Sequence, residues 1–199
     1  MEKPKRCAWC NEKNPLYVTY HDLEWGVLRL DDAYLYEMLI LESFQAGLSW
    51  ECVLNKREAF RAAYDGFDPR RVMHYGEEKI TSLIGNRGII RNRRKILAAI
   101  RNSRIFCEIV GEYGSFAGYL ETFTGGITLC ETGRTTNALS DAISRDLVAR
   151  GMTFVGSVII YSYLQAIGVI SSHEADCFLH RAGQISPEPK STDCQNEKR

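Results

Sequence analysis

Residues 77–105 read EEKITSLIGNRGIIRNRRKILAAIRNSRI, and the helix cap and the turn glycines in this stretch decide the fold. Asn92 is a good helix N-cap, and apolar residues follow it at helical spacing. Residues 77–84 form a shorter helical pattern, and the turn between the two patterns contains Gly85 and Gly88. The sequence therefore predicts two helices joined by a tight turn.

Similar signals for helix starts and ends recur on both sides of this stretch. Cap residues, a proline at a first helical position and terminal glycines predict further helices. These helices are expected at residues 32–46, 49–60, 69 onward, 115–123, 139–150 and 156–167, with a Gly/Thr-rich loop at residues 124–136. No segment alternates polar and apolar residues for long, so no strand is predicted. The pattern indicates an all-α fold of about eight helices around one core.

Length and composition agree with one globular domain. The chain has 199 residues and a mass of 22.6 kDa, which is enough for an ordinary domain with its own core. The hydrophobic fraction of 45% and charged fraction of 25% exclude disordered, collagen-like and coiled-coil chains. A net charge of zero excludes a uniformly basic nucleic-acid coat, although not a local basic patch. We expect a single domain at residues 1–182 and a polar, disordered tail at residues 183–199.

The sequence favours a cytoplasmic protein without membrane contact. Residues 1–7 lack an apolar run, so no secretory signal is predicted. Seven cysteines, an odd number, then favour free thiols or metal ligands over a disulfide framework. Residues 152–172 carry no charge, but polar residues and glycines interrupt the apolar run. A buried helix is therefore favoured there over a membrane span.

Four cysteine and histidine residues near the two ends of the predicted domain form a candidate metal set. Cys7 and His21 lie near one end, while His173 and Cys177 lie near the other at an i, i+4 spacing that puts both on one helical face. Two cysteines and two histidines form a closed tetrahedral zinc set, typical of a structural site. Alternatives remain open: isolated core or surface residues, a redox pair of Cys7 with Cys10, and His180 as a competing ligand.

A basic stretch covers residues 79–104. It contains eight lysine or arginine residues and no acid, and these are Lys79, Arg87, Arg91, Arg93, Arg94, Lys95, Arg101 and Arg104. Backbone amides of a glycine turn at a helix N-terminus, with arginines beside them, form a phosphate-binding device. A solvated cationic helix face is the competing interpretation.

Aromatic residues and two acids make a third constellation. Glu42 lies in an otherwise apolar helical stretch, where a carboxylate is costly without a partner or a function. Aromatic faces beside a buried acceptor suit a flat, nitrogen-rich or cationic ring. An ordinary core with Glu42 at its edge is the alternative. The other members of this constellation are Trp9, Tyr17, Tyr20, Glu24, Trp25 and Trp50.

Three separated stretches resemble a known family. They are YHDLEWG at residues 20–26, LESFQAGLSW at residues 41–50, and FVGS continuing to the Gln-Ala pair at residues 154–166. Together with the terminal Cys/His pairs they are similar to DNA-3-methyladenine glycosylase I, a bacterial family of the helix–hairpin–helix superfamily. The resemblance extends from about Cys7 to Cys177. As in that family, the Gly/Pro…Asp signature of other superfamily members is missing.

The resemblance implies a fold, a reaction and roles for particular residues. The fold would be all-helical, with one structural Zn²⁺ per chain held by Cys7, His21, His173 and Cys177. The reaction would be monofunctional hydrolysis of the N-glycosidic bond of 3-methyladenine in double-stranded alkylated DNA, by a monomer. Glu42 would be the catalytic residue that bonds the flipped base, Tyr20 and Trp50 would stack it, and Trp9, Tyr17 and Trp25 would surround it. The DNA backbone would be gripped by Gly85, Gly88, Arg91, Arg93 and Lys95.

Three positions depart from the family pattern, and two other functions remain in competition. Ser43 replaces a usual glycine, which would narrow the pocket floor, and Ser171 and Ser172 replace a usual Asn-Asp pair before His173. The first competing function is a zinc-stapled DNA-binding module without catalysis, which would not need Glu42. The second is a redox protein that uses two cysteines. The release of free methylated base from alkylated DNA discriminates among these functions.

Overall fold

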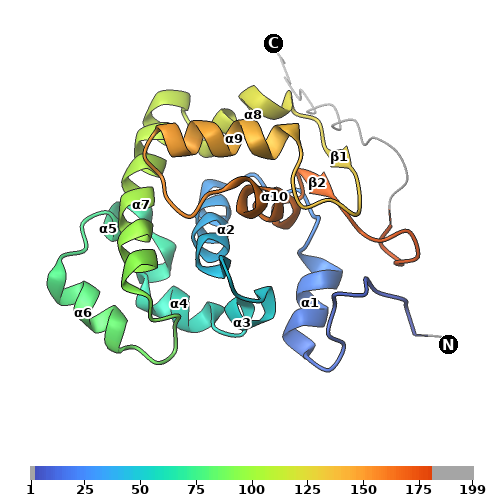
Figure 1. Ribbon diagram of the computed structural model, residues 1–199, viewed down its shortest axis with the longest axis horizontal. Helices are drawn as coiled ribbons and strands as arrows, with labels where there is room; N and C mark the ends of the chain where they lie inside the picture. Colours follow the sequence, from blue (N-terminus) through green and yellow to red (C-terminus); the bar gives the residue numbers. More distant parts are fainter. Residues whose placement is uncertain (1–2, 181–199) are drawn as a thin grey trace, which may run out of the picture.

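The computed structural model describes residues 3–180, and most of the regular structure in that part of the chain is helical (Figure 1). The elements in chain order are α1 (Pro15–Leu23), α2 (Asp32–Gln45), α3 (Trp50–Leu54), α4 (Arg57–Ala63), the 3₁₀ turn η1 (Asp65–Phe67), α5 (Pro69–Val72), α6 (Glu77–Gly85), α7 (Arg93–Tyr113), α8 (Phe116–Thr124), β1 (Leu129–Cys130), α9 (Ala138–Ala149), α10 (Ser157–Ala166) and β2 (Ile170–Ser171). The all-α prediction is therefore confirmed.

Local capping explains where most of these helices begin. The side chains of Asp31, Ser49, Asp68 and Asn92 each accept a hydrogen bond from a backbone N–H in the first turn of the helix that follows. Each bond satisfies a donor that a helix N-terminus leaves without an intrahelical partner. Each of these residues lies at the start of a predicted helix, which is why the predicted starts agree with the structure.

The structure has more elements than the predicted eight helices. Helix α1 was not predicted, although Asn14 caps it and Pro15 occupies its first position. The helix expected at residues 49–60 is divided into α3 and α4 at Asn55, whose side chain accepts a hydrogen bond from Asn14 Nδ2 (2.9 Å). Asparagine weakens a helix interior because its side chain competes for hydrogen bonds. The Gly/Thr-rich loop contains β1.

The prediction that the chain lacks strands was wrong by one short pair. Strands β1 and β2 are parallel, with Leu129 opposite Ile170 and Cys130 opposite Ser171. Strands of two residues are too short for any alternating pattern to reveal them. Their pairing is set by the long chain path that brings the segment after α8 beside the segment after α10.

Helices α2 and α10 form the centre of the molecule, with the other helices around them (Figure 1). In α2 every residue from Met38 to Phe44 is buried, including Glu42 and Ser43. The apolar helix α10 packs against both α2 and α9. Glu42 is therefore carried by the most buried helix of the fold, where a carboxylate would be excluded unless it had a purpose.

Within residues 3–180, no helix is both long and apolar enough to cross a membrane. The uncharged stretch at residues 152–172 instead supplies the buried helix α10 and the strand β2. The disordered tail predicted at residues 183–199 lies outside the described residues.

Candidate active site and metal centre

A cavity of about 330 Å³ opens beside the C-terminal half of α2. Its wall combines aromatic rings from the N-terminal region with polar groups from α2, α10 and the loop that follows β1. The lining residues are Trp9, Tyr17, Tyr20, Trp25, Glu42, Gln45, Trp50, Thr132, Gly133, Arg134, Ser162, Gln165, Ser172 and Glu174. All six residues predicted to contact a base line this one cavity.

Glu42 is the ionisable group at the centre of this wall. Its side chain is 3% exposed, and burial raises its pKa to about 8. Removing a carboxylate from water disfavours its charged form, and burial accounts for this shift. A perturbed carboxyl group in a cavity is typical of a functional site.

Three buried polar atoms at this cavity, one of them on Glu42, have no hydrogen-bond partner among residues 3–180. They are Glu42 Oε2, Gln45 Oε1 and Trp50 Nε1, two acceptors and one donor. Leaving a buried polar atom unbonded costs about 1–3 kcal/mol, so proteins rarely tolerate several together. Their gathering at one cavity indicates a ligand with both donors and acceptors on its edge.

The Tyr20 and Trp50 rings touch each other rather than standing apart. Their centroids are 5.4 Å apart and their planes are inclined by 44°. A base inserted between two rings needs roughly 7 Å, twice the stacking distance of about 3.4 Å. A planar ligand must therefore stack against the side of this pair that faces the cavity, or separate the rings.

An ion-pair network connects α4 to the elements that carry Tyr20 and Glu42. Arg57 of α4 donates to Glu24, which follows α1, at 2.6 Å and to Glu37 of α2 at 2.5 Å. Glu24 belongs to this network and not to the cavity lining, where the sequence analysis grouped it.

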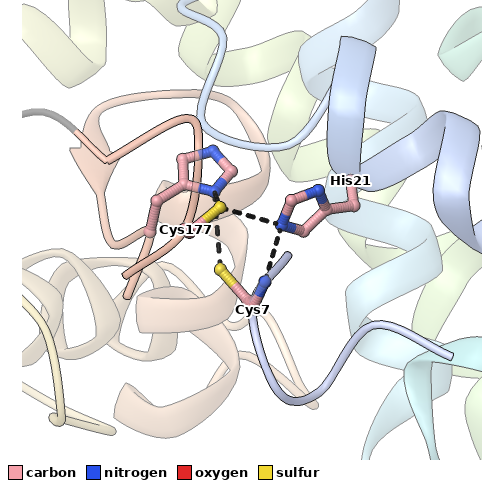
Figure 2. A group of neighbouring side chains, drawn as sticks. Cys7, His21 and Cys177 are labelled. Carbon is pink, nitrogen blue, oxygen red and sulfur yellow. Dashed lines mark hydrogen bonds between the residues drawn. The ribbon is translucent and has the colours of Figure 1, made fainter. Parts of the chain in front are cut away.

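The four predicted metal ligands meet on one side of the molecule, although they lie at opposite ends of the described chain. Their ligand atoms all lie within 4.8 Å of one another, and all four residues are buried. Figure 2 shows the side chains of Cys7, His21 and Cys177 pointing toward one another. Cys7 and His173 are in contact here although they lie 166 positions apart in the sequence, and so are His21 and Cys177, which lie 156 positions apart.

The distances between these atoms fit a tetrahedral metal site. Cys7 Sγ lies 3.5 Å from His173 Nδ1, and Cys177 Sγ lies 3.5 Å from His21 Nε2 and 3.6 Å from His173 Nδ1. Metal–ligand bonds of about 2.3 Å to sulfur and 2.0–2.1 Å to nitrogen place neighbouring tetrahedral ligands roughly 3.6 Å apart. The donor set therefore fits a metal ion that prefers four soft or borderline ligands.

The surroundings of His21 hold it in a ligand-competent form. Its Nδ1 lies 2.8 Å from Asp22 Oδ1, which leaves Nε2 facing the cluster. Arg6 in turn bonds Asp22 through two nitrogens, and this pairing holds the pKa of the Asp22 carboxyl below its usual value. A carboxylate behind a ligating histidine fixes the tautomer and ring orientation.

The Cys/His cluster lies behind the cavity wall, in contact with two aromatic rings that line the cavity. Trp25 packs against His173 at 4.7 Å, and Trp9 packs against His21 at 5.2 Å and against Trp25 at 4.8 Å between ring centroids. The positions of the cluster histidines therefore determine the positions of Trp9 and Trp25 in the cavity wall. Cys10 lies outside the cluster, with its Sγ 3.9 Å from the carbonyl oxygen of Tyr17.

The predicted hairpin exists as the turn at residues 86–92 between α6 and α7. Gly88 does not present its amide to solvent as expected, because its N–H donates to Asn86 Oδ1 (2.8 Å). A Cβ at Gly88 would lie 3.0 Å from Ala59 Cβ, so this glycine allows the turn to pack against α4. Gly85, the last residue of α6, is exposed.

The basic residues of this stretch separate into different environments. Arg91 is exposed, whereas Arg93 bonds Glu77 at 3.1 Å through one terminal nitrogen. Lys95, predicted as a DNA contact, is 6% exposed and its ammonium bonds two carbonyl groups inside the protein. Lys95 faces inward because its position in the first turn of α7 lies on the buried face, which the charge pattern alone did not indicate.

Some lining residues were missed by the sequence analysis. Gln45 follows Glu42 by three positions, so helical spacing already places both on one face of α2. Loop residues 132–134 carried no comparable signal, because only the path after β1 brings them to the cavity. Ser43 does not narrow the cavity floor as expected, since its hydroxyl donates to the Leu39 carbonyl (2.8 Å) within α2. Ser172 does line the cavity.

Comparisons with known proteins agree with this geometry. The sequence profile of the methyladenine glycosylase family matches residues 9–180. DNA-3-methyladenine glycosylase 1 of Escherichia coli (strain K12) is 43% identical over 180 residues, which cover 87% of this chain and 95% of that protein.

Solved structures of similar proteins share the fold. A crystal structure of 3-methyladenine DNA glycosylase I superposes with a TM-score of 0.84 at 41% identity, covering 89% of this chain and all of that one. A variant 3-methyladenine DNA glycosylase I in complex with 3-methyladenine superposes with a TM-score of 0.82 at 31% identity, covering 86% of this chain and 95% of that one. The helical fold and its cavity are thus those of a DNA glycosylase. More narrowly, the chain belongs to the methyladenine glycosylase family.

Proposed function

We propose that this protein excises 3-methyladenine from alkylated double-stranded DNA by hydrolysing the N-glycosidic bond, without lyase activity. The observation that carries the proposal is the aromatic cavity, whose buried polar atoms on Glu42, Gln45 and Trp50 have no partner in the described part of the chain. A flipped purine offers the flat face and the polar edge that these groups lack. The relatives named for 3-methyladenine, one of them in complex with that base, support this choice.

Glu42 gives the cavity a way to select a charged base. With a pKa of about 8, it is mostly protonated at neutral pH when no cation is near. A 3-methyladenine nucleotide carries positive charge, and an opposite charge in a buried site favours the carboxylate form. Normal adenine is neutral and offers no such stabilisation.

The reaction then needs little acid catalysis. The glycosidic electron pair moves onto the ring, the base departs neutral, and water adds to the sugar carbon and releases a proton. Glu42 accepts a hydrogen bond from the base edge, and its charge stabilises the positive character that develops on the sugar. Stacking on the Tyr20 and Trp50 pair can return about 1–3 kcal/mol per aromatic contact, which offsets the cost of extrusion.

The turn at residues 86–92 is proposed to hold the DNA backbone. The exposed side chain of Arg91 and the N-terminus of α7 beside it favour a phosphate group. Gly85, Gly88, Arg91 and Arg93 remain in this proposal, with Gly88 acting through close packing. Lys95 is not included, because its ammonium is buried.

The Cys/His cluster is proposed to hold one structural Zn²⁺ through Cys7, His21, His173 and Cys177. A bound ion would join the two ends of the domain, proposed to span residues 1–182, and would take no part in the chemistry. Burial raises the pKa of the Cys7 thiol to about 12, so a cation is needed to keep it a thiolate at neutral pH. We further propose that the protein acts as a monomer in the cytoplasm.

The substitution Glu42→Gln tests the proposed reaction. It keeps the side-chain size and removes the charge, so we expect single-turnover release of 3-methyladenine to fall about 100-fold, as for loss of one electrostatic transition-state contact. Chromatography of the bases released from methylated DNA measures this rate. The matched control is Glu108→Gln, an exposed acid on α7, which should excise at the wild-type rate. Wild-type release by both variants would contradict the assignment.

A further inference from the structure

Lys95 carries a buried positive charge that the proposed reaction does not use. The residue is 6% exposed, and among residues 3–180 no carboxylate lies within ion-pair distance of it. Its Nζ donates to the carbonyl oxygens of Phe44 (2.7 Å) and Ala46 (2.6 Å). Burial lowers the pKa of this ammonium. A buried charge without an opposite charge is costly, so its place in the fold needs an explanation.

The two carbonyl groups belong to the C-terminal end of α2. That end has no basic residue in its own last turn, and Ala46 follows it with a non-helical backbone. The last carbonyls of a helix are unsatisfied and partially negative, so a cation is stabilised beside them. Lys95 therefore supplies from α7 the cap that α2 lacks.

The same carbonyls lie directly beside the cavity floor. Phe44 and Ala46 flank Gln45, whose Oε1 is one of the unpartnered cavity atoms, and Glu42 lies one turn earlier. Fixing the backbone on both sides of Gln45 fixes the direction in which its amide points. Lys95 also lies in the first turn of α7, where its own N–H donates to the cap Asn92 (3.2 Å), next to the turn proposed to hold DNA.

We propose that Lys95 is a positioning residue, which links the DNA-holding turn to the cavity floor and orients Gln45 and Glu42 toward the base. It touches neither the base nor the sugar, so it acts only through these two residues. The inference rests on the proposed function and names a further residue on which that function depends.

The test compares Lys95→Met and Lys95→Arg with the control Lys79→Met. Methionine keeps the apolar stem but removes the donors, so affinity for free 3-methyladenine should fall about tenfold, while affinity for an undamaged duplex stays within about twofold. Arginine keeps the charge and should give an intermediate affinity. Lys79 lies on α6 and faces Asp65, and its variant should bind the base as the wild type does. Calorimetric titration measures the affinity for the free base and the affinity for the duplex.

A second measurement separates positioning from a structural role. If Lys95 acts through Gln45, the effect of Lys95→Arg on base affinity should largely disappear in a Gln45→Ala background. Equal effects in both backgrounds, or wild-type base affinity in Lys95→Arg, would overturn the inference even if Lys95→Met fails to fold. Failure of the wild-type protein to bind or release 3-methyladenine would instead overturn the proposed function, and the inference with it.

Discussion

At the scale of single residues, Glu42 couples function to stability. The unfolded chain ionises this group near 4.5, whereas the folded protein holds its pKa at about 8. Between these values the unfolded state binds fewer protons than the native state, so the contribution of Glu42 to folding becomes less favourable as the pH rises. This residue is kept in the core at a cost, which is the usual sign of a site selected for activity.

Glu42→Gln should therefore stabilise the protein in a pH-dependent way. The amide does not ionise, so at pH 9 the free energy of unfolding of the variant should exceed that of the wild type by a few kcal/mol, at about 1.4 kcal/mol per pKa unit. The variant should therefore melt at a higher temperature than the wild type at this pH. At pH 4.5 the gain should be small. Calorimetric melting at both pH values measures the difference. Glu108→Gln should show no such divergence, and a gain of equal size at both pH values would contradict the pKa assigned to Glu42.

Individual side chains also show what a charge pattern can and cannot reveal. The eight basic residues of the 79–104 stretch look equivalent as letters. In the structure Arg91 is exposed, Arg93 is paired with Glu77, and Lys95 is buried on two carbonyl groups. Arg91 lies in the turn before α7, whereas the face of α7 that packs against the end of α2 decides that Lys95 points inward.

At the scale of elements, the α6–turn–α7 unit presents its basic side chains where the chain reverses direction. Gly88 lets the turn lie against α4, and Lys56 donates to the carbonyl oxygen of Gly88 (3.3 Å). The turn is thus held from behind, while Arg91 remains exposed. This unit was predicted well, because its caps and glycines act within a few residues of one another.

Arg91→Ala should weaken DNA binding uniformly across sequences. Loss of one phosphate contact should reduce the slope of log affinity against log salt by about 0.9. Fluorescence anisotropy of a labelled duplex at several salt concentrations measures that slope. Arg145→Ala removes the same charge from the exposed side of α9 and should leave the slope unchanged. Equal slopes for wild type and Arg91→Ala would exclude Arg91 from the contact.

At the scale of the whole molecule, the Cys/His cluster closes the fold. The segment that carries His173 and Cys177 lies on the same side as α1, which carries His21 (Figure 1). Because Trp9 and Trp25 pack on the cluster histidines, the closure also shapes the cavity. Linking segments so distant in sequence removes much conformational freedom from the unfolded chain.

Metal removal should therefore loosen both ends of the domain together. Elemental analysis should find about one zinc per chain, and chelation or Cys7→Ser should lower the melting temperature by about 10 °C. Cys10→Ser is the matched control, because this buried thiol lies outside the cluster, and it should retain the metal. A metal-free protein that melts as the native one does would refute the structural ion.

The sequence by itself determined the helical class, most helix starts, and the chemical types at the site. Caps, prolines and glycines act over a single turn, so Asp31, Asn92 and their counterparts are readable as letters. Only the tertiary structure decided that Cys7 meets Cys177, that β1 pairs with β2, that the Tyr20 and Trp50 rings touch, and that Lys95 faces inward. These outcomes depend on packing between segments far apart in the chain, and no local pattern encodes which faces will meet.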